Sequence, residues 1–391
     1  ITNKMEVLNM KFKKLSASVL AAALIVSLLP VQAFALSDEE VKAPSAVLME
    51  AETGKVLYEK NPHEKRPCAS ITKVMTLTLI MESVDSGKIK LTDLVSASEH
   101  AASMGGSDIW LKPGENMTVD DMLKATVIAS ANDAAVALAE YVSGSEEEFI
   151  QQMNEKAKTL GMKDTVFKNC NGLDEDGHIT SAYDVALMSR ELMKHKKIFD
   201  YTTTWIENIR GGKTQLVNTN KLIKSYKGIT GLKTGTTGKA GSCISATAER
   251  DNVKLISVIL GASNTKDRFS SASKLLDYGF ANWAIVKPEL PKDSLKSVKV
   301  INGMTDSVGT EVTLDSSVLV PKGKVKEIKH EISFNENVNA PVKKGQKLGK
   351  IIYKLDNEVI KQYDICAKND VPEITFNSAF KFLTKYLLKM L

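Results

Sequence analysis

Three short motifs carry side chains that can do acyl-transfer chemistry. In chain order they are Ser70-Ile71-Thr72-Lys73, Ser130-Ala131-Asn132 and Lys233-Thr234-Gly235. Together they supply a nucleophile, a base, a proton relay and a carboxylate anchor, the parts of a serine acyl-transferase that works without a catalytic histidine. Each motif alone is weak, since Ser-x-x-Lys occurs four times in the chain. Their order and spacing, in a chain with a predicted export signal, predict the active site.

The first motif can supply a nucleophile and its base. Ser70 follows a loop that contains Pro67 and begins a predicted helix over residues 70–84. Three residues make about one helical turn, a rise of about 4.5 Å, so Lys73 lies on the same face as Ser70. Burial lowers the pKa of a lysine, which lets Lys73 accept the proton of the Ser70 hydroxyl.

The second motif can move a proton and hold substrate. We expect the Ser130 hydroxyl to shuttle the proton from Lys73 to the leaving nitrogen, and the Asn132 amide to hold the substrate backbone. The alternative for Asn132-Asp133 is simple capping of the following helix.

The third motif can bind the end of a peptide. Glycine on an edge strand, here Gly235, lets a peptide pair with the backbone, while Lys233 and Thr234 bind its terminal carboxylate. The backbone N–H groups of Ser70 and Thr236 would then form the oxyanion hole.

The elements that must position these residues alternate between strand and helix patterns. Strands are predicted around a turn at 52–54 and again over 243–248 and 253–260, and helices over 70–84, from 118 with breaks to 155, over 181–194 and over 268–283. Thr118 is expected to cap the second helix. Strands at both ends of a helical middle imply one sheet built from both ends of the domain, an α+β fold.

The pattern of apolar and polar residues changes after Pro288. Short alternating strands between 295 and 371, such as 297–301 and 311–314, with turns at 321–323 and 344–345, indicate a small all-β module. In the last sixteen residues Lys381, Lys385 and Lys389 share one face of a helical wheel, opposite apolar side chains. This pattern is typical of an interfacial membrane helix, and the alternative is a helix that docks on its own domain.

The N-terminus resembles an export signal. Basic residues precede an apolar run over 15–29, and Ala33-Phe34-Ala35 follows Pro30, so cleavage is predicted after Ala35. An uncleaved anchor is the alternative, but fifteen residues fall short of the ~20 that span a bilayer. The net charge of +5 resides at the two ends of the chain, so the body offers no basic groove and nucleic acid is not an expected partner.

The cysteines and histidines suggest no second chemistry. The four cysteines contain no Cys-x-x-Cys pair, so neither a zinc site nor a redox pair is indicated, and we expect no metal or cofactor. Three disulfide pairings and four mostly buried thiols both stay open. A thiol reagent at Cys68 could block the neighbouring Ser70. His178 is expected to have a structural hydrogen-bonding role.

At these motifs the chain resembles the low-molecular-mass penicillin-binding proteins, the D-alanyl-D-alanine carboxypeptidases of serine peptidase family S11. The resemblance implies a β-lactamase/transpeptidase-like catalytic domain, a small all-β domain and a membrane-anchoring helix, with no cofactor. We accordingly expect a signal peptide over 1–35, a catalytic domain over 36–286, an all-β domain over 287–375 and an amphipathic helix over 376–391.

The resemblance also implies an activity at the outer face of the cytoplasmic membrane. Ser70 would be acylated by the terminal D-Ala-D-Ala of a peptidoglycan stem peptide, release D-alanine and be hydrolysed, and β-lactams would acylate it too. By position, the implied catalytic residues are Ser70, Lys73 and Ser130, and the implied substrate contacts are Asn132, Lys233, Thr234, Gly235, Thr236 and Arg268.

Two departures bear on the alternatives. Some relatives carry histidine where this chain has Thr236. Class A β-lactamases carry aspartate in place of Ala131 and a deacylating Glu-x-x-Leu-Asn motif that is missing between Asn132 and Lys233. We therefore expect penicillin to leave slowly, which ranks a β-lactamase below a DD-endopeptidase. The alternative from another class is a catalytically idle wall-binding scaffold.

Overall fold

The computed structural model describes residues 36–314 and 316–390. The predicted signal peptide and its cleavage site lie outside these residues. In the described part, the core of the fold is an antiparallel sheet with the strand order β2-β1-β9-β8-β7. Its strands are β1 (Ser45–Glu50), β2 (Val56–Lys60), β7 (Ile229–Thr237), β8 (Gly241–Arg250) and β9 (Val253–Ala262).

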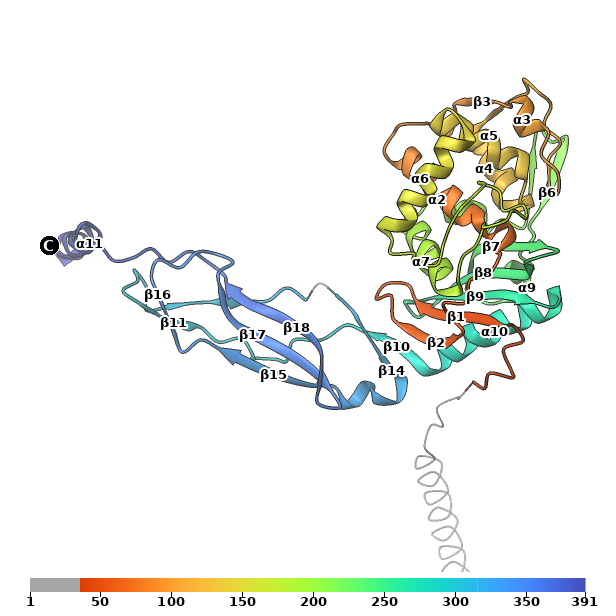
Figure 1. The fold of residues 1–391 in the computed structure, drawn as a ribbon. Helices are drawn as coiled ribbons and strands as arrows, with labels where there is room; N and C mark the ends of the chain where they lie inside the picture. Colours follow the sequence, from red (N-terminus) through yellow and green to blue (C-terminus); the bar gives the residue numbers. More distant parts are fainter. Residues whose placement is uncertain (1–35, 315, 391) are drawn as a thin grey trace, which may run out of the picture. The chain divides into compact units, whose positions relative to one another are not determined.

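The sheet joins the two ends of its domain, as the sequence predicted. β1 pairs with β9 along its whole length, from Ser45 opposite Leu260 to Glu50 opposite Leu255. All six residues of β1 are buried, because both faces of the sheet are covered. Helix α10 (Thr265–Asn282), joined by Leu222 of α9 (Leu222–Ser225), covers one face, and the helices between residues 69 and 202 cover the other (Figure 1). Alternate side chains of β1 therefore enter two different cores.

A helical lobe covers the second face. Its helices are η1 (Ala69–Thr72), α2 (Lys73–Asp85), α3 (Glu99–Ala102), α4 (Val119–Lys124), η2 (Ala125–Ala129), α5 (Asn132–Ser143), α6 (Glu146–Thr159), α7 (Ala182–Leu192) and α8 (Ile198–Thr202). Two hairpins pair β3 (Leu94–Ser96) with β4 (Asn116–Thr118) and β5 (Ile206–Ile209) with β6 (Thr214–Val217), and α9 (Leu222–Ser225) follows β6 in the chain. Thr118 caps α4 as predicted, since its Oγ1 accepts a hydrogen bond from the Asp121 N–H.

One helix prediction needs correction in detail, and another is confirmed. The helix expected from Ser70 begins instead as the 3₁₀ turn η1, and α2 starts at Lys73. The helical pattern after Thr118 has a break, as predicted: it ends in η2, a π-helical turn, where Ser130 adopts a left-handed conformation with φ +63°. Such conformations end helices and recur at functional sites.

The C-terminal part is β-rich, with sheets β10-β14, β12-β11-β16 and β13-β18-β17-β15. The strands are β10 (Trp283–Val286), β11 (Val298–Ile301), β12 (Ser307–Val308), β13 (Thr310–Glu311), β14 (Val318–Pro321), β15 (Lys329–Phe334), β16 (Asn337–Asn339), β17 (Lys347–Leu355) and β18 (Glu358–Ala367), with the helices η3 (Lys322–Glu327) and α11 (Phe376–Met390). The strand predicted over 311–314 stops at Glu311, because Val312 and Leu314 pack against a core cluster instead. The turn predicted at 321–323 is the start of η3. No helix in the described ranges is long and apolar enough to cross a membrane.

Candidate active site

The Ser70 hydroxyl lies beside a buried amine. Lys73 has no exposed surface, and its Nζ lies 3.1 Å from Ser70 Oγ, 2.5 Å from Asn132 Oδ1 and 2.7 Å from the Asn171 carbonyl oxygen. Burial lowers the pKa of Lys73 to about 7. A neutral amine has two N–H bonds, which the two carbonyl oxygens accept. Its lone pair is then left to face the Ser70 hydroxyl, as a general base requires.

Two backbone segments press on the turn that carries Ser70. A Cβ atom on Gly235 of β7 would lie 2.9 Å from Ser70 N, and one on Gly172 would lie 2.0 Å from the Ala69 carbonyl oxygen. Real side chains do not tolerate such distances, so both positions require glycine. Ala69 itself has φ +51°, an unusual conformation for a residue with a side chain. The nucleophile is therefore held on both sides by main chain.

Ser130 pairs with the second lysine of the motifs. Lys233 is 1% exposed, and its Nζ donates to Ser130 Oγ over 2.8 Å and to the Thr234 carbonyl oxygen over 3.0 Å. Burial, and then the positive charges of Lys73 and Arg268, lower the pKa of Lys233 well below its ordinary value. Because Ser130 Oγ accepts from Lys233, its own proton is free to be donated.

Asn132 connects the base to a neighbouring loop. Its Oδ1 accepts from Lys73, while its Nδ2 donates to the Gly105 carbonyl oxygen over 2.6 Å. The capping alternative is wrong, because the N-cap of α5 is Ala131 and makes no side-chain cap. Asp133 instead accepts backbone N–H groups from the loop before β4, at Ile109 and Leu111.

Arg268 is not a surface residue. It is 5% exposed, and its Nη1 donates to the Gly235 carbonyl oxygen over 3.1 Å and to Thr236 Oγ1 over 3.0 Å. Among the described residues its Nε has no hydrogen-bond partner. Together with Lys73 and Lys233 it makes a cluster of three buried basic side chains, none of which forms an ion pair with a described carboxylate. Such a site favours an anionic ligand.

The sequence motifs missed several supporting groups. Thr219 Oγ1 accepts from Thr234 Oγ1 over 2.7 Å, and the carbonyl groups of Gly105 and Asn171 orient Asn132 and Lys73. Backbone carbonyls carry no residue signature, so no motif could have found them. The glycine of Asn171-Gly172 was a detectable signal, since this dipeptide often marks a left-handed turn.

His178 has the expected structural hydrogen-bonding role, because it bonds to η1, the turn that carries Ser70. Its Nδ1 accepts from the Lys168 N–H over 3.1 Å, so Nε2 carries the proton and donates to Thr72 Oγ1 over 2.7 Å. Burial lowers its pKa to about 4, which keeps the ring neutral.

The cysteines form no disulfide. Cys68, Cys170 and Cys243 are buried and Cys366 is half-buried, so the four-thiol alternative is confirmed over the pairings. Cys68 is 1% exposed, and burial raises its pKa to about 12. A thiol that is neither accessible nor ionised reacts slowly, so the expected block of the site by thiol reagents is not supported.

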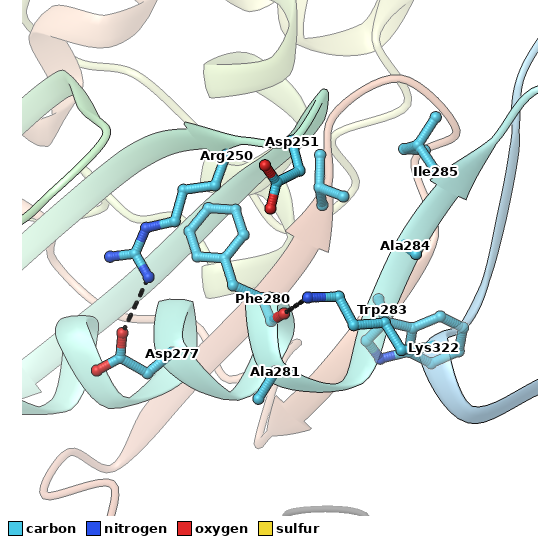
Figure 2. A pocket seen from close by; sticks show the side chains of 10 residues that line it. Arg250, Asp251, Asp277, Phe280, Ala281, Trp283, Ala284, Ile285 and Lys322 are labelled. Carbon is cyan, nitrogen blue, oxygen red and sulfur yellow. Dashed lines mark hydrogen bonds and ion pairs between the residues drawn. The ribbon is translucent and has the colours of Figure 1, made fainter.

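A separate cavity of about 410 Å³ lies beside the end of α10, and none of the motif residues lines it. In Figure 2 the Arg250 side chain extends across the Phe280 ring, and its guanidinium pairs with Asp277 over 3.6 Å. Lys322 Nζ donates to the Phe280 carbonyl oxygen over 2.6 Å. Because this cavity offers no nucleophile beside a base, we regard it as structural.

The motif side chains that meet beside β7 define the class of protein. An antiparallel sheet covered by helices on both faces, with Ser-x-x-Lys, Ser-x-Asn and Lys-Thr-Gly side chains meeting at its edge strand, is typical of penicillin-recognising serine enzymes. Within that class the chain belongs to the D-alanyl-D-alanine carboxypeptidase family, peptidase S11, whose sequence model matches residues 32–264. The model of the penicillin-binding protein 5 C-terminal domain matches residues 289–373.

Relatives of known name agree with this membership. The chain is 45% identical over 379 residues to the D-alanyl-D-alanine carboxypeptidase DacF of Bacillus subtilis, covering 94% of this chain and 97% of the relative. It is 35% identical to DacC of Escherichia coli, covering 93% and 94%.

Solved structures agree as well. Penicillin-binding protein 5 of Haemophilus influenzae superposes with a TM-score of 0.74 at 31% identity, covering 87% of this chain and all of that one. Penicillin-binding protein D2 of Listeria monocytogenes, solved in an ampicillin-bound form, gives 0.57 at 33% identity, covering 61% of this chain and 98% of that one.

Proposed function

We propose that the chain is a serine-type D-alanyl-D-alanine carboxypeptidase that removes the terminal D-alanine from peptidoglycan stem peptides. The observation that carries this proposal is the contact between Ser70 Oγ and Lys73 Nζ, with Lys73 held by two carbonyl oxygens. Family membership and the names of the relatives supply the substrate class.

In the proposed reaction, Ser70 Oγ attacks the carbonyl carbon of the penultimate D-alanine while its proton passes to Lys73 Nζ. Ser130 then gives its proton to the leaving amine and takes the proton held by Lys73, the peptide C–N bond breaks and D-alanine departs. Water hydrolyses the resulting ester and restores Ser70. The N–H groups of Ser70 and Thr236 stabilise the tetrahedral oxyanion in this scheme.

The terminal carboxylate of the substrate is proposed to bind beside β7, next to the buried basic side chains. Lys233 and Thr234 would contact it directly, and Gly235 leaves the β7 backbone open to the peptide. Arg268 lies behind β7, where its guanidinium holds the Gly235 carbonyl oxygen and Thr236. We therefore assign Arg268 to charge stabilisation and to positioning of Thr236. The amide of Asn132 is assigned to the substrate backbone.

Penicillin is proposed to acylate Ser70 and to leave slowly. The relative from Listeria monocytogenes was solved with ampicillin bound, which supports β-lactam recognition by this fold. A Cβ atom on Gly172 would lie 2.0 Å from the Ala69 carbonyl oxygen, so position 172 has no room for a carboxylate that would activate a deacylating water. Rapid multiple turnover of a β-lactam would contradict this proposal.

Export and membrane attachment are proposed from the chain ends, and the substrate supports an extracytoplasmic site of action. The pattern of residues 1–35 supports a signal peptide. Helix α11 has exposed apolar side chains at Phe380, Leu383 and Leu387 with exposed lysines at 381 and 385, which supports binding to an anionic membrane surface. We keep 36–286, 287–375 and 376–391 as the catalytic, all-β and anchoring segments.

Labelling with a fluorescent penicillin tests the proposal. We expect one labelled peptide that contains Ser70, lost in Ser70→Ala and retained in Ser263→Ala, which removes the exposed serine of another Ser-x-x-Lys sequence. Absence of label on the folded wild type would favour the idle scaffold. Release of D-alanine from monomeric rather than cleavage of dimeric muropeptides would separate the carboxypeptidase from the endopeptidase.

A further inference from the structure

The loop before β4 displays a tryptophan that the proposed reaction does not use. Trp110 is 81% exposed and has φ +55°. In contrast, Trp205 lies under the Lys224 ammonium, and Trp283 has a buried ring nitrogen. A left-handed conformation costs a bulky L-residue about 1–2 kcal/mol. Strain at a residue that adds little packing marks a functional position more often than a structural one.

The residues on either side of Trp110 enforce this conformation. Ile109 and Leu111 are 2% and 4% exposed, and their N–H groups donate to the Asp133 carboxylate over 3.1 Å and 3.0 Å. Arg210 Nη1 donates to the Ile109 carbonyl oxygen over 2.8 Å. With both neighbours turned inward and bonded, the indole must point outward. The ring is therefore positioned before any ligand binds.

The same loop is bonded to the active site. Asn132 donates its backbone N–H to the Ser107 carbonyl oxygen over 2.6 Å and its side-chain N–H to the Gly105 carbonyl oxygen. A Cβ atom on Gly106 would lie 2.9 Å from Asn132 Nδ2, so the contact is tight. The loop that carries Trp110 is therefore hydrogen-bonded to the residue proposed to hold the substrate backbone.

The surroundings of the ring define what it can bind. A hollow of about 650 Å³ is lined by Trp110, Lys112, Pro113, Glu115 and Arg210. Beside the indole, the hollow presents the apolar side chains of Ile109 and Pro113 and the charged side chains of Lys112, Glu115 and Arg210, of which Arg210 Nε donates to Glu115 Oε1 over 2.7 Å. A protein or lipid partner would need a wider apolar patch. A pyranose ring suits this surface, since it has an apolar C–H face and a rim of hydroxyl and amide groups.

We propose that Trp110 binds an N-acetylhexosamine ring of the glycan strand that carries the stem peptide. This inference rests on the proposed function, because that substrate joins a sugar to the peptide that enters the groove. The ring face of the sugar lies on the indole, while its polar rim meets Lys112, Glu115 and Arg210. Trp110 contributes to binding of the long substrate and takes no part in bond breaking.

The test compares two substrates with the same pentapeptide stem, one free and one attached to a disaccharide. Full-length wild type, Trp110→Ala, Trp110→Phe and Leu94→Ala are assayed for D-alanine release. Leu94 is a matched control, since it is an exposed apolar side chain of the same lobe, 63% exposed. The readout is the ratio of kcat/KM for the disaccharide substrate to kcat/KM for the free peptide.

We expect Trp110→Ala to lower this ratio about fivefold through KM, Trp110→Phe to lower it less, and Leu94→Ala to leave it at the wild-type value. An unchanged ratio in Trp110→Ala, with penicillin labelling intact, would overturn the inference. So would an equal loss on both substrates, which would place Trp110 in the peptide groove.

A separate arm keeps this inference distinct from the proposed function. Peptide-free oligomers of N-acetylhexosamines are titrated into the untreated wild type and Trp110→Phe, with tryptophan fluorescence as the readout. A saturable change in the wild type that is lost in the variant supports the glycan site even if neither stem releases D-alanine. No saturable change in the wild type would contradict it.

Discussion

Lysine side chains have opposite surroundings in the active site and in the β-rich C-terminal part. In the active site, Lys73 and Lys233 are at most 1% exposed and bind hydroxyl and carbonyl oxygens. In the C-terminal part, Lys347 and Lys354 are 54% and 29% exposed and form ion pairs with Asp364 and Glu331. The first arrangement lowers a lysine pKa, whereas an ion pair at the surface leaves the amine protonated.

This difference separates a lysine that takes part in a reaction from a lysine that only makes the surface soluble. A buried lysine without a carboxylate partner destabilises the fold through desolvation, so its retention needs a reason beyond stability. An exposed pair contributes roughly 0–1 kcal/mol and needs no special environment. The surroundings of a lysine are therefore more informative about function than its presence in a short motif.

The largest effect is expected from removing Lys73, the buried lysine beside Ser70. We expect Lys73→Met to slow acylation by a fluorescent penicillin by about 10²- to 10⁴-fold, because Ser70 loses its general base. The measurement is the rate of labelling under single-turnover conditions. Lys347→Met, which removes a surface lysine, is the control and should label at the wild-type rate. Equal labelling of both variants would break the comparison.

A pH profile sharpens the same point. With a Lys73 pKa of about 7, the acylation rate should fall about tenfold per pH unit below pH 7 and level off above it, because only the neutral amine accepts the proton. Rates are measured from pH 5 to 9, with circular dichroism as a check that the protein stays folded. A rate that still rises tenfold per unit between pH 8 and pH 9 would show that Lys73 behaves as a surface lysine does.

Two histidines extend the comparison to stability. Burial lowers the pKa of His178 to about 4, whereas the neighbouring Glu146 carboxylate raises the pKa of the more exposed His100. Since the unfolded chain binds a proton near pH 6.5, His178 should remove about 2 kcal/mol of stability between pH 7 and pH 4.5. Urea unfolding should show a smaller loss over this range in His178→Asn. An identical pH dependence in both proteins would contradict the assignment.

The smallest effect is expected at the surface pair itself. Lys347→Met should change the free energy of unfolding by less than about 0.5 kcal/mol, since the exposed pair with Asp364 is screened by solvent. Urea unfolding at low and high salt measures this. A loss above 1 kcal/mol would mean that ion pairs stabilise the C-terminal part more than their exposure suggests.

The sequence predicted the sheet and the reactive side chains better than the backbone groups that hold those side chains in place. The spacing of Ser70 and Lys73 follows from helix geometry, and the apolar run of β1 follows from burial on both faces, so both were accessible. A break in the helical pattern was predicted, but the left-handed conformation of Ser130 was not, because it depends on contacts with residues distant in sequence such as Lys233. The carbonyl oxygens that orient Lys73 carry no sequence signature at all.

The close approach of Gly172 to the nucleophile's turn has a consequence for antibiotic resistance. A β-lactam-hydrolysing descendant would need a carboxylate near the acyl ester to activate water. At position 172 even a methyl group would lie 2.0 Å from the Ala69 carbonyl oxygen. An aspartate or glutamate placed there would push the Ser70 turn aside before it could act on water. This mutational route to drug destruction is closed by main-chain geometry, and escape from the drug through this loop would require rebuilding its path.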